Sequence, residues 1–169
     1  MVMWEFYSSI FNYMRPVIIN RKEDRYSQFY MQCAYNAAEL SYATRRKVGA
    51  VAVKDGNILG FGFNGTPAGC DNCCEDSNGE TLESVIHAED NLLRKLVQLQ
   101  GVPSIEHLNL DGFTIYVTKE PCINCAELFL KVKGQFELIF KENSKTKPLE
   151  GVHHLAKNAP DITIYRMPS

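Results

Sequence analysis

Residues 48–63 read VGAVAVKDGNILGFGF, and they contain two strand-like runs on either side of a turn. Residues 48–53 form a β-branched run and residues 58–63 alternate, which is typical of two strands. Between them Asp55-Gly56 makes a tight turn, because glycine tolerates the positive φ that such turns need. The stretch therefore predicts a β-hairpin.

The segments around the hairpin have alternating helix and strand patterns. Before it, apolar side chains recur every three or four positions over residues 23–43, which predicts a helix. After it, the sequence predicts a loop over 64–79, a helix from Thr81 or Ser84 to about Gln100, a strand over 113–118, a helix over 122–133, a strand over 136–140, a helix over 149–158 and a strand over 162–165. This order indicates an α/β fold of three αβα layers, with a five-stranded mixed sheet and helices on both faces.

Size and charge limit what the chain can be. Its 169 residues predict one domain over 23–169, after an aromatic-rich N-terminal extension over 1–22. A formal net charge of −2 lacks the basic footprint of nucleic-acid-binding proteins and fits a small anionic ligand better. No apolar run reaches the roughly 18 residues of a membrane span, and no secretion signal is evident. We therefore expect no nucleic-acid or membrane partner and a cytoplasmic location.

Six cysteines without a secretion signal indicate metal binding rather than disulfides. In PCINC, residues 121–125, Cys122 and Cys125 lie three apart at the start of a predicted helix, so both can face one point. In HAE, residues 87–89, His87 lies in the neighbouring predicted helix and can complete the set. Zinc accepts these ligands, and a catalytic zinc keeps a fourth position for water. The sequence therefore predicts bound Zn²⁺.

Glu89 lies two residues from His87, near the metal without being needed as a ligand. There it can accept a proton from the activated water and pass it on as a general base and acid. The motifs H-x-E and P-C-x-x-C together mark zinc nucleobase deaminases. The alternative is a closed structural zinc site with a fourth ligand from Cys70, Cys73 or His107, which leaves Glu89 without a task.

At these residues the chain resembles the cytidine deaminase superfamily, and within it the deoxycytidylate (dCMP) deaminases, particularly those of phages. The supporting stretches are RKVGAV over residues 46–51, GFNGTPAG over residues 62–69, and Ala126 after the second cysteine. The resemblance spans roughly residues 27–165. It implies a cytidine deaminase-like fold and hydrolysis of dCMP to dUMP and ammonia in pyrimidine deoxynucleotide metabolism, in the host cytoplasm if the source is viral.

The resemblance also implies nucleotide contacts and regulation. Asn64 would hydrogen-bond the sugar, and the backbone at Ala88 would contact the base. Phosphates of the substrate or an effector would lie near Arg46, Lys47, Gly62, Phe63 and Gly65. Solvated charges and an ordinary loop connection are the alternatives for these residues. A homo-oligomer, often a hexamer, activated by dCTP and inhibited by dTTP with Mg²⁺, is also implied.

Two features depart from the family pattern. Many relatives place a tyrosine near the base shortly after the fourth strand, but residues 141–146 contain no aromatic side chain. Some phage relatives hold a second zinc after the glycine-rich loop. Cys70, Cys73 and Cys74 are candidates for it, yet residues 75–84 contain no histidine, and free thiols are the alternative.

Other functions stay open at this point. A superfamily member could act on cytidine, a modified cytosine, guanine or a tRNA adenosine, although the near-neutral charge disfavours tRNA. A catalytically inactive relative could serve as a nucleotide-binding regulator. The presence of Glu89 argues against that second reading.

Overall fold

The computed structural model describes residues 21–145, 147–159 and 161–168, so most of the N-terminal extension predicted over 1–22 lies outside the described residues. The domain limits therefore stay a prediction. In chain order the elements are α2 (Arg21–Ala38), β1 (Gly49–Lys54), β2 (Asn57–Phe63), α3 (Ala88–Gln100), the short 3₁₀ helix η1 (Ile105–His107), β3 (Thr114–Lys119), α4 (Ile123–Lys131), β4 (Phe136–Glu142), α5 (Glu150–Asn158) and β5 (Ile162–Arg166).

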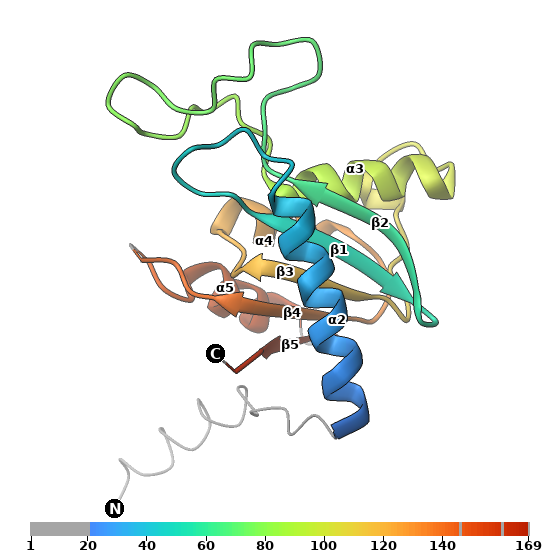
Figure 1. Ribbon diagram of the computed structural model, residues 1–169. Helices are drawn as coiled ribbons and strands as arrows, with labels where there is room; N and C mark the ends of the chain where they lie inside the picture. Colours follow the sequence, from blue (N-terminus) through green and yellow to red (C-terminus); the bar gives the residue numbers. More distant parts are fainter. Residues whose placement is uncertain (1–20, 146, 160, 169) are drawn as a thin grey trace, which may run out of the picture.

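The strands form one five-stranded sheet in the order β2-β1-β3-β4-β5 (Figure 1). β1 runs antiparallel to both β2 and β3, whereas β3, β4 and β5 are parallel. The predicted hairpin is confirmed, and its turn has positive φ at Asp55 (50°) and Gly56 (76°). The predicted mixed sheet is confirmed as well.

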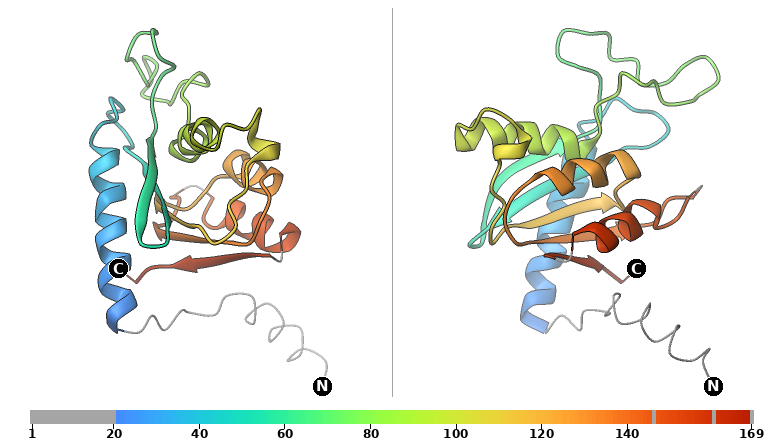
Figure 2. Two further views of the ribbon diagram at one scale, coloured as in Figure 1. Left: turned by 90° about the vertical axis from the view of Figure 1, so that its right-hand side faces the viewer. Right: turned by 180° about the vertical axis from the view of Figure 1, so that it is seen from behind.

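Helices cover both faces of the sheet, as predicted, but unequally (Figure 2). α2 alone covers one face, where its buried side chains pack on Val51, Tyr116 and Ile139. α3, α4 and α5 cover the other face and contact Ile115 and Val117. Because side chains alternate along a strand, β3 sends its odd-numbered residues toward the three helices and Tyr116 toward α2.

Two predicted helix boundaries were wrong. The helix expected from Thr81 or Ser84 begins only at Ala88, because the backbone of Ile86 pairs with Gly65 through hydrogen bonds of 2.8 and 3.0 Å. The first helix ends at Ala38 instead of near residue 43, and the next residues turn so that the Ser41 hydroxyl donates to the Asn64 carbonyl. Among the described residues no helix is long and apolar enough to cross a membrane.

The connection from β2 to α3 rises above the sheet beside the loop that follows α2 (Figure 1). Glu75 joins the two segments, because its Oε1 accepts hydrogen bonds from the backbone nitrogens of Thr44 and Arg45 at 3.0 and 3.1 Å. A small apolar cluster of Ala43, Cys74 and Val85 lies underneath. The connection between β2 and α3 is therefore anchored by packing and hydrogen bonds.

Candidate active site

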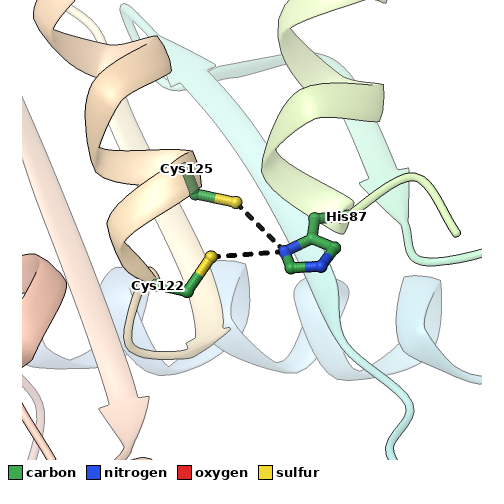
Figure 3. Close-up of side chains that lie close together, drawn as sticks. All are labelled: His87, Cys122 and Cys125. Carbon is green, nitrogen blue, oxygen red and sulfur yellow. Dashed lines mark hydrogen bonds between the residues drawn. The ribbon is translucent and has the colours of Figure 1, made fainter. Parts of the chain in front are cut away.

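The starts of two neighbouring helices bring the motif residues together. His87 is the N-cap of α3 and Cys122 is the N-cap of α4, and both have extended backbones, with ψ of 158° and 173°. Cys125 lies in the first turn of α4. From these positions the imidazole points at both sulfur atoms (Figure 3).

The spacing of these three side chains fits zinc. His87 Nδ1 lies 3.4 Å from Cys122 Sγ and 3.4 Å from Cys125 Sγ, and the three ligand atoms lie within 4.8 Å of one another. A tetrahedral zinc, with bonds of about 2.3 Å to sulfur and 2.0 Å to nitrogen, would set these atoms about 3.5 Å apart. No fourth metal-binding side chain joins the group within the described part of the chain. The donor set is therefore that of an open catalytic zinc site rather than a closed structural one.

The cysteine pair is electrostatically asymmetric. The hydrogen bond donated by Cys125, followed by that of His87, lowers the pKa of Cys122 to about 4. The same bond and burial raise the pKa of Cys125. The lowered pKa of Cys122 favours its thiolate, which is the form that binds zinc.

Glu89 lies in the first turn of α3, only 3% exposed, next to the three metal-binding side chains. Burial raises the pKa of its carboxyl group to about 7. A group with a pKa near neutrality can both accept and donate a proton under physiological conditions. The burial and the raised pKa are compatible with the proton transfer predicted for Glu89, and that role stays a prediction.

Asn64, the predicted sugar contact, has a structural task in addition. It is 8% exposed, its Oδ1 accepts from the Val48 backbone nitrogen at 2.8 Å, and its Nδ2 donates to the Arg46 carbonyl at 2.9 Å. Asn64 thereby fixes the backbone just before β1. Because an amide can make further hydrogen bonds, the sugar contact stays a prediction.

Gly62, a predicted phosphate neighbour, lies where β2 touches the first turn of α3, and its contact with a phosphate stays a prediction. A Cβ atom there would come within 2.2 Å of the Ala88 carbonyl oxygen and 2.6 Å of the Leu92 nitrogen. Ala88 is fully buried at this contact. The absence of a side chain at Gly62 therefore lets the helix that carries His87 and Glu89 lie directly on the sheet.

The candidate ligands for a second zinc differ in burial and do not lie together. Cys70 and Cys73 are exposed and Cys74 is buried, and within the described residues they form no group of three metal ligands. A second zinc at these cysteines thus finds no support in the geometry. Phe63 and Gly65 make backbone contacts, with Phe63 accepting a hydrogen bond from Asn91 at 2.9 Å.

Two charged residues directly before the PCINC motif were missed from the sequence. Lys119 ends β3, and Glu120 follows it, buried at 6% exposure. Glu120 Oε1 accepts backbone hydrogen bonds from Ser144 at 2.7 Å and Leu149 at 2.9 Å, which hold the connection between β4 and α5 beside Cys122. The sequence did contain a signal for these two residues. A lysine and a glutamate follow a buried strand, and a buried charge requires a hydrogen-bond or ionic partner.

Comparisons with known proteins agree with this geometry. The family described as "Cytidine and deoxycytidylate deaminase zinc-binding region" matches residues 24–140. The deoxycytidylate deaminase of Mycobacterium phage D29 is 34% identical over 133 residues, which cover 70% of this chain and 96% of that protein. The deoxycytidylate deaminase of Enterobacteria phage T4 is 29% identical over 180 residues, covering 82% and 88%.

A solved structure extends the similarity to three dimensions. The dCMP deaminase from cyanophage S-TIM5, in complex with dCMP and dUMP, matches with a TM-score of 0.70 and 31% identity, covering 83% of this chain and 95% of that one. The fold, the donor set for zinc and the sequence relatives all lead to one family. This chain belongs to the dCMP deaminase family of the cytidine deaminase superfamily, and it is a zinc-dependent deaminase.

Proposed function

We propose that this deaminase converts dCMP to dUMP with release of ammonia. The observation that carries the proposal is the buried carboxyl of Glu89 beside the open set of His87, Cys122 and Cys125. The reaction type follows from that site. The choice of dCMP is supported by the relatives from phages D29 and T4 and by the dCMP complex of the cyanophage protein.

The chemistry divides between the metal and Glu89. When bound, zinc supplies a water molecule whose pKa is lowered toward about 7. As the oxygen of the attacking water bonds to C4 of the cytosine, Glu89 accepts a proton from that water. Glu89 then donates this proton to ring nitrogen N3. Glu89 then carries the second proton of that water to the amino group, which leaves as ammonia when the bond from C4 to nitrogen breaks. The product is uracil with a carbonyl at C4 and a proton at N3.

The remaining parts of the substrate would lie along residues named above. Asn64 would contact the sugar, and the backbone at Ala88 would contact the base. Regulation by dCTP and dTTP and assembly into a homo-oligomer stay predictions of the family resemblance. Residues 141–146 supply no aromatic side chain to stack on the base, so a 5-substituted cytosine belongs among the test substrates.

A substrate panel tests the proposal. The purified zinc-loaded protein is mixed with dCMP, CMP, deoxycytidine or 5-hydroxymethyl-dCMP, with and without dCTP, and ammonia release and ultraviolet absorbance are followed. We expect the highest kcat/KM with dCMP. A higher value for another substrate would replace dCMP and keep the mechanism. No turnover with any of the four would support a nucleotide-binding regulator.

A further inference from the structure

Two large aromatic side chains near the start of α2 are exposed. Tyr26 is 57% exposed and Phe29 is 56% exposed. Both rings contact the ring of Tyr30, with centroids 6.4 and 5.4 Å away. The Tyr30 hydroxyl donates a hydrogen bond of 2.8 Å to the Gly56 carbonyl, in the turn between β1 and β2. The exposed aromatic side chains of α2 therefore lie next to the hairpin.

The hairpin adds two apolar side chains to the same surface. In the pairing of β1 with β2, Ile58 is opposite Val53, and Phe61 is opposite Val51. Opposite residues on neighbouring strands point to the same face of a sheet. Val51 and Val53 pack in one cluster with Tyr30 of α2. Ile58 and Phe61 therefore face the side of the sheet that carries α2, yet they are 42% and 43% exposed.

We call these four side chains, Tyr26, Phe29, Ile58 and Phe61, the α2–β2 surface. α2 contacts β2, which is an edge strand of the sheet, so the four side chains belong to neighbouring elements. Single exposed apolar side chains are ordinary, whereas a group of them on neighbouring elements indicates a binding surface. The α2–β2 surface is therefore a candidate for contact with another apolar segment.

The edge of β2 limits how such a segment can bind. Lys95 Nζ donates to the Phe61 backbone carbonyl at 2.8 Å, and Asn91 Nδ2 donates to the Phe63 backbone carbonyl at 2.9 Å. Both donors come from α3, so part of the edge is already occupied. Packing of side chains, rather than addition of a strand, is therefore the mode of binding that fits this surface.

Residues 1–20 have the composition that the α2–β2 surface requires. Thirteen of these twenty residues are apolar or aromatic, and only Glu5 and Arg15 are charged. The family match begins at residue 24, so this stretch precedes the part of the chain that the family shares. A stretch of this composition is stabilised by contact with other apolar groups.

The stretch is attached close to the surface and is long enough to cover it. It ends where α2 begins, at Arg21, which is five residues before Tyr26. Twenty residues can span at most about 70 Å, whereas the 18 residues of α2 are about 27 Å long. Attachment to the same chain also gives the stretch a high effective concentration at this surface.

We propose that residues 1–20 pack over the α2–β2 surface of their own chain. This surface lies on the face of the sheet that α2 covers, opposite the helices that carry the zinc ligands (Figure 2). The packing therefore stabilises the domain and takes no part in the deamination. The inference does not depend on which nucleotide the enzyme deaminates.

Trp4 is the only tryptophan of the chain, so its fluorescence reports on residues 1–20. Emission and quenching by acrylamide are measured for the wild type, for the double variant Tyr26→Gln/Phe29→Gln and for Leu99→Gln. Leu99 is a matched control because it is 58% exposed on α3, which covers the other face. We expect the wild type and Leu99→Gln to emit at a shorter wavelength than free tryptophan in water and to resist quenching.

The double variant should emit at a longer wavelength, be quenched more strongly and melt about 3–8 °C lower, because two aromatic contacts are lost. Its zinc content and kcat should stay near wild type, which also verifies that it folds. Ile58→Thr examines the same surface from β2, and its Trp4 emission should shift in the same direction.

Three results would overturn the proposal. Wild-type Trp4 that emits and is quenched like free tryptophan would show that the stretch lies in water. A shielded Trp4 that is unchanged in both the double variant and Ile58→Thr would place the stretch elsewhere. Co-expression of the double variant with Trp4→Phe, which has an intact surface and no tryptophan, tests a second copy. A return toward the wild-type wavelength would show that the stretch packs on another chain instead of its own.

Discussion

Among single residues, the buried carboxyl of Glu89 has the most specific role in the proposed mechanism. We expect Glu89→Gln to keep the fold and the zinc and to lower kcat about 10²- to 10⁴-fold, because glutamine has a similar shape but cannot accept a proton. KM should change little, since the loss falls on the chemical step. Steady-state kinetics with metal analysis of the same sample checks this. A kcat within about tenfold of wild type would remove Glu89 from the proton transfer.

The residue scale also shows where sequence reasoning succeeds and where it stops. That Cys122 and Cys125 face one point follows from their three-residue spacing at a helix start, which is a local property, and the paired motifs then identify His87 as the third ligand. The position of Lys119 relative to the residues before β1 depends on the register of β1 against β3. The sequences of two strands that are far apart along the chain do not reveal that register. Lys119 was therefore not singled out from the sequence, whereas Arg46 was already a candidate phosphate contact with a solvated charge as the alternative.

Among the elements, the contact of β2 with α3 supports the site from behind. We expect Gly62→Ala to lower the free energy of unfolding by about 1–3 kcal/mol and to reduce bound zinc and kcat, because a Cβ atom would overlap the Ala88 carbonyl and displace the start of α3. Thermal unfolding, zinc content and kinetics measure the three effects.

Gly60→Ala is the matched control, because it lies two residues away on the same strand. Its Cβ atom would meet only the side chains of Leu92 at 3.3 Å and Leu96 at 3.4 Å, which can shift. If Gly62→Ala were as stable as Gly60→Ala and bound equal zinc, the close approach of strand and helix would have no role in the site.

Element boundaries were harder to predict than the elements themselves. The turn residues Asp55-Gly56 gave the hairpin directly, because few other residues adopt that backbone. The late start of α3 at Ala88 depends on the pairing of Ile86 with Gly65, a contact across 21 residues of chain that propensity does not reveal. Residues 81–87, which end with the metal ligand His87, are therefore extended or in turns instead of helical.

At the scale of the whole molecule, zinc joins two helices that belong to different parts of the chain. Because the metal binds the folded arrangement better than the unfolded chain, we expect its removal to lower the melting temperature, and added zinc to restore it. Differential scanning calorimetry before and after chelation, with the zinc content measured each time, tests this. Cys122→Ser should melt at one temperature with or without chelator. Equal melting of zinc-loaded and zinc-depleted wild type would show that the metal serves catalysis alone.

The architecture was largely predictable at this scale, because a hairpin followed by alternating units admits few arrangements. The sequence pattern could not predict how many helices cover each face of the sheet. α2 alone covers one face because its apolar side chains meet Val51 and Ile139, whereas three shorter helices share the other. Which face a helix covers depends on long-range packing, and amphipathicity alone does not encode it.

The division of the site between α3 and α4 has a consequence for synthesis on the ribosome. His87 and Glu89 emerge with the first hundred residues, but Cys122 and Cys125 follow only 35 and 38 residues after His87. A nascent chain that has completed α3 therefore has one zinc ligand and no catalyst. The zinc site can be completed only after α4 has been synthesised, so a chain that ends before Cys122 is expected to be inactive.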